Sequence, residues 1–407
     1  MKKQFVRKGA VIVLIISIIS TLTGCWDRRE LNTLGITSSI GIDRKDGVYH
    51  LAMEVYHAEQ PGKVVKQENK SDFLQTTGTS FFDALRNVDT EYDKKIFLYQ
   101  TKELIFGDET AREGFIDVLD FWMRRYETWP NTYVLISPED SPTEVLGMKR
   151  GSEEVTANYL DKLEENENLT GKTLHTSVAD FLRFYFDNGY ALCGTILRQK
   201  SDESAPTQPQ GGGSSDAAQK NLNLLKAEGA AVFSGQKLIG YLDGIETRGL
   251  NFISGKLKRT VIVSPSPAGS GNNSVEVLRA GAKMEVLELG DKPRLKVVIK
   301  VNGKLVEETG AEDLAMNRSV LRQIEALNSQ TIKAEAEQVI KKAQDELCLD
   351  IFGFSGAVHR QHPDQWRVLK DRWNELFSEA DVTVEVQTTI RRIGLLETPL
   401  NRRATNK

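Results

Sequence analysis

The chain has 407 residues, of which 40% are hydrophobic and 27% are charged, and its formal net charge at pH 7 is -4. This composition excludes a globally disordered chain and a membrane protein with many spans, because apolar residues are numerous and charges of both signs are interspersed. Three cysteines in this length exclude a small scaffold that depends on disulfides. An acidic chain binds phosphate backbones poorly, so we expect no nucleic-acid partner.

Residues 1–24 have the pattern of a secretory signal peptide. Basic residues between Lys2 and Lys8 precede an apolar run that is too short to span a bilayer comfortably. Leu22 to Gly24 and the following Cys25 resemble a bacterial lipobox, in which the cysteine thiol receives a diacylglycerol group before cleavage. We therefore predict removal of residues 1–24 and anchoring of the mature chain to a lipid bilayer through Cys25. An ordinary signal peptide followed by a chance cysteine is the alternative.

A segment without large apolar residues divides the chain near its middle. Residues 199–221 contain no Leu, Ile, Val, Met or aromatic residue and include the run Gly211 to Ser215. Such a composition is typical of a flexible linker or a long loop. We predict an N-terminal α/β region at 25–198, a C-terminal α+β domain at 222–394 and a polar tail at 395–407.

In the N-terminal region, strand and helix patterns alternate. Strands are expected at 36–43 and 48–57, joined by an Asp46-Gly47 turn, and further strands within 95–106 and at 132–137. Apolar residues at helical spacing predict helices over 81–92 and 111–126, and a third helix capped by Ser177. Because the pattern becomes more helical after residue 138, we expect two subdomains with a boundary near residue 140.

The C-terminal half shows clearer periodicity. A hairpin is expected at 229–242, and apolar residues alternate with polar ones at 295–301 and 382–390, which is typical of half-buried strands. Helices are expected over 332–347 and from Pro363 onward. The sequence thus predicts a multidomain α+β or mixed α/β protein, in which mixed or antiparallel sheets are covered by helices.

Motifs that would indicate catalysis are missing from the sequence. It contains no HExxH, GxSxG or Walker A pattern, and no GxGxxG after a strand. Acidic residues such as Asp243, Glu246, Asp350 and Asp364 are expected at helix termini or on the solvated surface. We therefore expect no enzymatic activity, no metal and no cofactor.

Several short motifs, taken in order, resemble those of one family. Residues 25–31 (CWDRREL) are followed by LGI at 34–36 and IGID at 40–43, and YVLIS lies at 133–137. The C-terminal half adds GAAVF, KLIG, ETRGL and DIFGF, at 229–233, 237–240, 246–250 and 350–354, and then Pro363 and Trp366. Together they resemble the Ger(x)C family, the lipoprotein C subunits of the nutrient germinant receptors of spore-forming bacteria. The family often has a glycine where this chain has Ser355.

The resemblance implies a three-domain architecture and a non-catalytic subunit on the outer face of the inner spore membrane. It also implies two partners, the A subunit and the membrane B subunit of the receptor. Residues Glu246, Thr247 and Arg248 follow a hairpin and lack a strong apolar stripe, so they are either the start of a helix or an exposed interaction element. The competing hypothesis is a solute-binding lipoprotein of a transporter, which would have two lobes with continuous apolar parallel strands.

Overall fold

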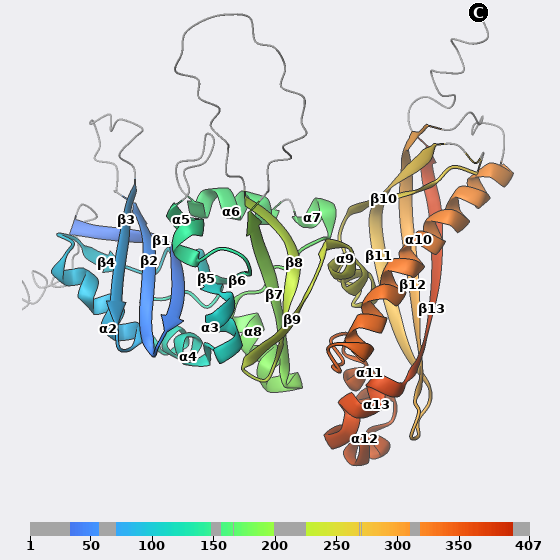
Figure 1. Cartoon of the computed structure of the whole chain (residues 1–407). Helices are drawn as coiled ribbons and strands as arrows, with labels where there is room; N and C mark the ends of the chain where they lie inside the picture. Colours follow the sequence, from blue (N-terminus) through green and yellow to red (C-terminus); the bar gives the residue numbers. More distant parts are fainter. Residues whose placement is uncertain are drawn as a thin grey trace, which may run out of the picture.

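The computed structural model describes residues 33–56, 71–147, 156–165, 167–198, 225–267, 269, 271–309 and 318–393. Two sheets with their helices lie side by side (Figure 1). This mixture of sheets and helices confirms the predicted α+β class. Cys25, the expected linker at 199–221 and the expected tail at 395–407 lie outside the described residues.

The first sheet has the strand order β3-β2-β1-β5-β6-β7-β8-β9, with β4 beside β1. The central pairs from β1 through β5 and β6 to β7 are parallel, and the outer pairs on both sides are antiparallel. The strands are β1 (Leu34–Lys45), β2 (Val48–Tyr56), β3 (Ser71–Gly78), β4 (Lys95–Phe97), β5 (Glu103–Gly107), β6 (Tyr133–Ser137), β7 (Tyr190–Arg198), β8 (Leu225–Ser234) and β9 (Lys237–Leu242).

The predicted hairpin at the start of the sheet is confirmed. Lys45 pairs with Val48, and the two turn residues have left-handed backbone conformations, with φ of 51° at Asp46 and 77° at Gly47. Asp and Gly adopt this conformation at low cost, and its twist matches that of the flanking strands.

Helices cover both faces of the first sheet (Figure 1). Residues of α2, α3, α4 and α8 enter a large hydrophobic cluster on one face, and residues of α5 and α6 enter a smaller cluster on the other. The helical elements of this region are α2 (Phe81–Asn87), η3 (Val88–Thr90), α3 (Asp108–Glu113), α4 (Ile116–Arg124), α5 (Pro142–Gly147), α6 (Thr156–Glu165), α7 (Glu167–Thr170) and α8 (Val178–Asn188).

The sequence predicts one helix over 111–126, whereas the structure has two. Gly114 has a φ of 102°, which no helix accommodates, so α3 ends before it and α4 begins at Ile116. The apolar residues of the predicted stripe are nevertheless buried as far as Trp122. Tyr126, the last residue of the predicted helix, lies beyond the end of α4 and is 83% exposed.

The second sheet has the order β10-β11-β12-β13. Its first two pairs are antiparallel, but β12 and β13 are parallel, because the long helix α10 and three shorter helices form a crossover between them. The elements are α9 (Gly244–Ile253), β10 (Thr260–Pro265), β11 (Asn272–Glu288), β12 (Arg294–Glu308), α10 (Arg318–Asp345), α11 (Phe354–Gln361), α12 (Pro363–Leu369), η4 (Lys370–Arg372), α13 (Trp373–Glu379) and β13 (Asp381–Ile393).

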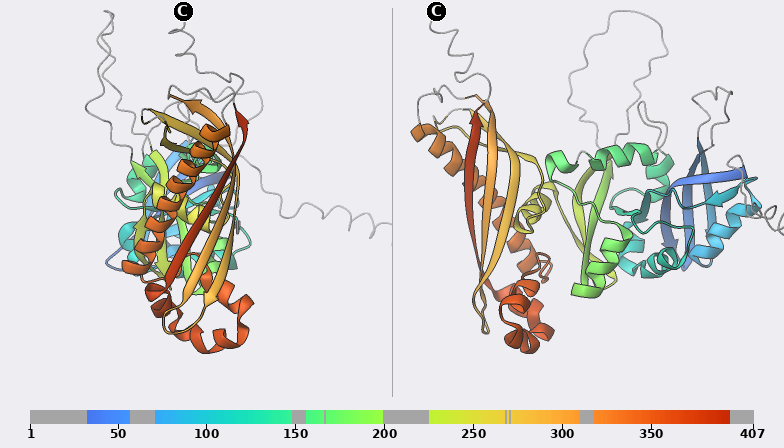
Figure 2. Two further views of the ribbon diagram at one scale, coloured as in Figure 1. Left: turned by 90° about the vertical axis from the view of Figure 1, so that its right-hand side faces the viewer. Right: turned by 180° about the vertical axis from the view of Figure 1, so that it is seen from behind.

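Among the described residues, helices cover one face of the second sheet and not the other. Figure 2 shows α10 lying along one side of the strands, while the opposite side is open. Along β12 the buried residues from Leu295 to Val301 alternate with exposed or half-buried residues such as Lys296 and Lys300. This confirms the half-buried strands that the alternating sequence predicts.

The expected boundary at 199–221 does not separate the two sheets. The sequence assigns residues 222–242 to the C-terminal domain, whereas β8 pairs with β7 and β9 pairs with β8 in the first sheet. The first sheet also contains strands from both sides of the subdomain boundary that was expected near residue 140. Across this boundary, β6 and β7 are joined by two residue pairs, Leu135↔Gly194 and Ile136↔Thr195. A polar stretch marks a loop, but strand pairing across that loop is decided by backbone hydrogen bonding.

We call the first sheet with its helices the first region, and the second sheet with its helices the second region. The two regions share a hydrophobic core. Along β7 and β8, Ala191 and Ala231 enter the cluster on the helix-covered face of the first sheet. Their neighbours Tyr190 and Ala230 point the other way and enter a cluster that continues into the second sheet and α10. Because side chains of a strand alternate between its faces, these two strands belong to both cores.

Candidate functional site

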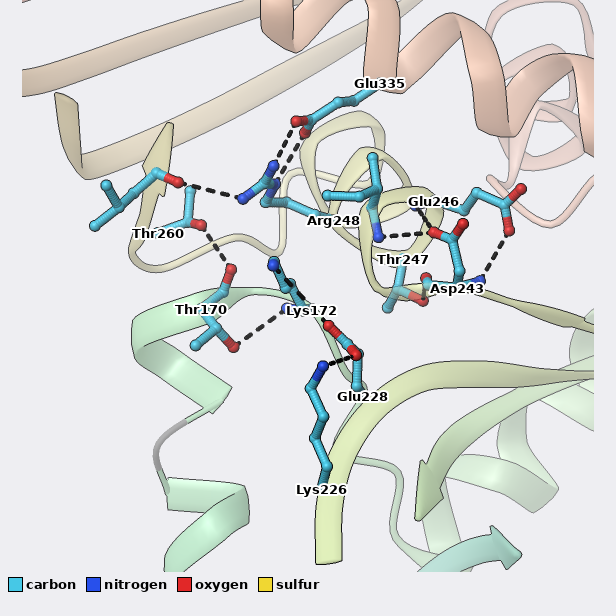
Figure 3. Close-up of polar contacts among 12 residues, drawn as sticks. Thr170, Lys172, Lys226, Glu228, Asp243, Glu246, Thr247, Arg248, Thr260 and Glu335 are labelled. Carbon is cyan, nitrogen blue, oxygen red and sulfur yellow. Dashed lines mark hydrogen bonds and ion pairs between the residues drawn. The ribbon is translucent and has the colours of Figure 1, made fainter. Parts of the chain in front are cut away.

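The residues predicted as an interaction element lie in the first turn of α9, at the junction of the two regions (Figure 3). The Asp243 carboxylate accepts hydrogen bonds from the backbone N–H groups of Ile245 and Glu246, both at 2.8 Å. In return, the Glu246 carboxylate accepts a 2.8 Å bond from the Asp243 N–H. This reciprocal arrangement is a capping box, which satisfies donors that the first helical turn would otherwise leave unpaired.

Arg248 points toward α10 and forms a bidentate ion pair with Glu335. Arg248 Nε donates to Glu335 Oε2 at 2.9 Å, and Nη2 donates to Oε1. Arg248 Nη1 also donates to the Val261 carbonyl at 3.2 Å, which ties α9 to β10. Because both side chains are only 9% exposed, each charge depends on the other for compensation.

Two further residues hold α9 close to α10. Glu246 accepts a 2.7 Å bond from Lys342 Nζ. At Gly249 the helices approach so closely that a Cβ atom would lie 2.5 Å from the Glu335 carbonyl oxygen. The motif ETRGL therefore serves helix packing: it supplies a cap, an ion pair and a position that only glycine can occupy.

Of the two predictions for this element, the start of a helix agrees with the structure and the exposed interaction element does not. Glu246 is 7% exposed, Thr247 is 0% exposed and Arg248 is 8% exposed. Their partners are residues of the same chain, and the alternative prediction, the start of a helix, describes them. Glu335 could have been suspected from the sequence, because a carboxylate three residues after Ile332 and four before Val339 lies on the buried face of α10.

On its other side, α9 contacts the segment between α7 and α8. The Asn251 amide donates to the Gly171 carbonyl at 3.0 Å and to the Thr173 carbonyl at 3.3 Å. Thr260, at the start of β10, donates a 2.6 Å bond to the Thr170 carbonyl. These polar contacts connect α9 and β10 to the first region, and Figure 3 shows the bond between Thr260 and Thr170.

The DIFGF motif forms a second buried structure built on one carboxylate. Asp350 is 2% exposed and accepts bonds from four backbone N–H groups between Phe352 and Ser355, at 2.7–3.2 Å. It also accepts a 2.9 Å bond from Trp373 Nε1. Gly353 has a φ of 88°, so glycine is suited to this turn. The serine at 355 is compatible with the turn, since the bond to Asp350 uses its backbone N–H.

Few reactive groups occur among the described residues. They contain no group of three or more His, Cys, Asp or Glu side chains able to hold a metal ion. In the same ranges no helix is both long and apolar enough to cross a membrane. Cys193 and Cys348 are both free thiols; the first is buried and the second is exposed. Burial raises the pKa of the Cys193 thiol well above its usual value, so this group is unsuited to nucleophilic chemistry.

Comparisons with known proteins give a consistent result over nearly the whole chain. Residues 27–198 match the family described as "Spore germination protein N-terminal domain", and residues 228–394 match "Spore germination B3/ GerAC like, C-terminal". Spore germination protein KC of Bacillus subtilis is 24% identical over 97% of this chain and 98% of that protein. Spore germination protein B3 of the same organism is 22% identical over 93% of this chain and 96% of that protein.

A solved structure shares the fold. The crystal structure of the GerBC protein superposes with a TM-score of 0.56 and 18% sequence identity, covering 86% of this chain and 96% of the other.

Proposed function

Because the chain belongs to the Ger(x)C family of spore germination proteins, we propose that it is the lipid-anchored, non-catalytic C subunit of a nutrient germinant receptor. The observation that carries the proposal is the pair of family matches, which lie in order and together extend from residue 27 to residue 394. In this role the protein works with the A subunit and the membrane B subunit at the outer face of the inner spore membrane.

The sequence supports the lipid anchor. The lipobox-like residues Leu22 to Cys25 follow a basic and then an apolar segment, the order that lipoprotein signal peptides have. Two acyl chains on Cys25 would hold the protein on a membrane, since each buried CH₂ contributes about 0.8 kcal/mol. The helices and strands of the folded body lie between residues 34 and 393, so we expect it to remain intact without the anchor.

Fractionation of cells that express Cys25→Ala tests the anchor. We expect the variant to leave the membrane fraction and to lose metabolic label from a radioactive fatty acid, while its circular dichroism spectrum stays unchanged. Cys348→Ala is the matched control, because it removes an exposed thiol of the folded body and leaves the lipobox intact. Retention of Cys25→Ala in the membrane without label would contradict the proposed anchor.

A deletion strain tests the receptor role. Spores that lack the protein should fail to germinate with one nutrient or nutrient mixture, and they should respond normally to a trigger that acts independently of nutrients. Reintroduction of the wild-type gene should restore the response, and co-purification should recover the A and B subunits with the protein. Normal responses of the deletion spores to every nutrient that the parent strain senses would contradict the proposal.

The competing transporter hypothesis fits the fold less well. It requires two lobes built on parallel strands that are covered on both faces, and the first sheet contains such strands. The second sheet is largely antiparallel and open on one face, so the two regions are not equivalent lobes.

A further inference from the structure

A cavity of about 640 Å³ lies at the junction of the two regions. One part of its wall comes from α8 and β7 of the first region. The other part comes from the end of α9, the segment at 256–259 and the DIFGF turn with α11. The volume lies within the range of about 300–1,000 Å³ that small-molecule sites occupy, and junctions between domains are common places for them.

Positive charge dominates the polar lining of this cavity. Five cationic side chains line it, whereas Asp180 is the single carboxylate in the lining: the cations are Arg183, Lys256, Lys258, Arg259 and Arg360. Asp180 is already engaged by the Ser177 hydroxyl at 2.9 Å and by Arg183 at 2.7 Å. Because the whole chain has a net charge of -4, this concentration of cations runs against its overall charge.

Four of these cations form no ion pair among the described residues. Arg183 pairs with Asp180, but no ion pair within those ranges involves Lys256, Lys258, Arg259 or Arg360. Lys256 Nζ lies 4.6 Å from the centre of the Phe184 ring, and Arg183 Cζ lies 5.3 Å from the same centre. Lys256 and Arg360 are exposed, so an added anion can reach both side chains and would stabilise their charged forms.

Part of the remaining wall is apolar. Leu250 and Ile351 are 3% and 2% exposed, and Tyr190, Leu192 and Phe184 complete a hydrophobic surface beside the cations. A wall of this kind removes water from a ligand and strengthens its charge interactions, because attraction between opposite charges increases as the local dielectric constant falls.

From this cavity and its unpaired cations, we propose that the junction binds a small organic anion, with a carboxylate or phosphate group at Lys256 and Arg360 and an apolar part against Leu250 and Ile351. Such a ligand contacts elements of both regions and therefore stabilises their relative placement. The proposal does not depend on the receptor role, since it rests on the cavity alone.

Calorimetry of the purified full-length protein in detergent tests the site with defined probes. Benzoate and phenyl phosphate carry an anionic group on an apolar ring, and benzamide is the matched neutral probe. We expect at least one of the two anions to bind at least ten-fold more tightly than benzamide. Inorganic phosphate is the probe for charge without an apolar part, and we expect it to bind at least ten-fold more weakly than phenyl phosphate.

Substitutions locate the binding within the cavity. The double variant Lys256→Gln/Arg360→Gln should bind the better anion at least ten-fold more weakly, whereas Lys292→Gln, an exposed lysine in the loop between β11 and β12, should bind it normally. If the double variant fails to fold, Arg360→Gln alone, on the exposed side of α11, should still weaken binding at least three-fold. Unchanged binding in the folded variants, or no binding of either anion by the wild-type protein, would overturn the proposal.

Discussion

The two sheets of this protein differ in the number of faces that other elements cover. In the first sheet, consecutive residues Leu104 and Ile105 of β5 enter two different hydrophobic clusters, and both are 0% exposed. In the second sheet, Val297 of β12 is 0% exposed, whereas its neighbour Val298 lies on the open face and is only partly buried. The comparison shows that apolar residues are continuous along a strand when both faces of its sheet are covered, and alternate with less buried residues when one face is open.

The partners of charged side chains also differ between the covered first sheet and the open face of the second sheet. The covered first sheet contains the buried carboxylates Glu54 and Glu103, which are 5% and 0% exposed. Thr156, at the start of α6, donates its backbone N–H to Glu54, and Ser39 donates its hydroxyl to Glu103. On the open face of the second sheet, Lys296 instead pairs with Glu385 at 2.7 Å near solvent. A charged side chain on a covered face of a sheet thus needs a hydrogen-bond partner within the protein, because water cannot reach it.

The largest effect is expected at the junction that joins the two regions. Arg248→Ala leaves the buried Glu335 carboxylate without its partner, so it should lower the free energy of unfolding by about 3–5 kcal/mol. Urea denaturation followed by circular dichroism measures this loss. Arg183→Ala is the control, because its ion pair with Asp180 is exposed and should contribute less than about 1 kcal/mol. Equal effects of the two substitutions would show that Arg248 is not a buried contact.

Alanine substitutions in adjacent strand positions test the comparison directly. Leu104→Ala and Ile105→Ala should each lower the free energy of unfolding by about 2–5 kcal/mol, because both faces of β5 are covered. In β12, Val297→Ala should cost about 1–3 kcal/mol, whereas Val298→Ala should change stability by about 0.5 kcal/mol or less. A large loss at Val298, measured by the same denaturation experiment, would mean that another element covers the open face.

Limited proteolysis tests how β7 and β8 join the regions. We predict that the first cut falls within residues 199–221, where the composition is polar and rich in glycine. Because β7 and β8 pair from Tyr190↔Ser234 to Arg198↔Leu225, the two fragments should remain together. Gel filtration of the cut protein should therefore give one peak, which separates into two bands only after denaturation. Two separate native peaks would contradict the shared sheet.

The smallest effect concerns the two thiols of the folded body. Cys348 is exposed and should react with a thiol reagent in the native protein, whereas Cys193 is buried and should react only after unfolding. A spectrophotometric thiol assay on the Cys25→Ala variant should thus count one reactive group, and a second after addition of guanidinium chloride. Cys348→Ala should abolish the native signal. Rapid reaction of Cys193 would indicate that β7 opens readily.

Local patterns were enough to predict many elements. The Asp46-Gly47 hairpin, the Ser177 cap and the helix start at Pro363 are all present, because short-range geometry determines them. The apolar alternation in β12 also predicted a half-buried strand, since side-chain direction follows from the strand period. The motifs that resemble the Ger(x)C family likewise identified the family that the comparisons report.

The candidate site was only partly predictable. Asp243 and Asp350 were expected at helix termini or on the surface, and both bind the first turn of a helix. The partner of Arg248 lies 87 residues away on α10, so no local pattern could distinguish an exposed arginine from a buried one. Burial depends on which element packs against the residue, and that is a property of the tertiary structure.

The sequence by itself determined several strands, among them β1, β2, β12 and β13, together with the main helices, the caps and the family. These depend on residue spacing and on motifs along the chain. The tertiary structure alone decided that β8 and β9 complete the first sheet, that the ETRGL motif is buried and that cations gather at the junction cavity. Strand pairing, ion-pair partners and cavities join residues that are distant in the sequence. Their free energies depend on distances and burial that exist only after the chain has folded.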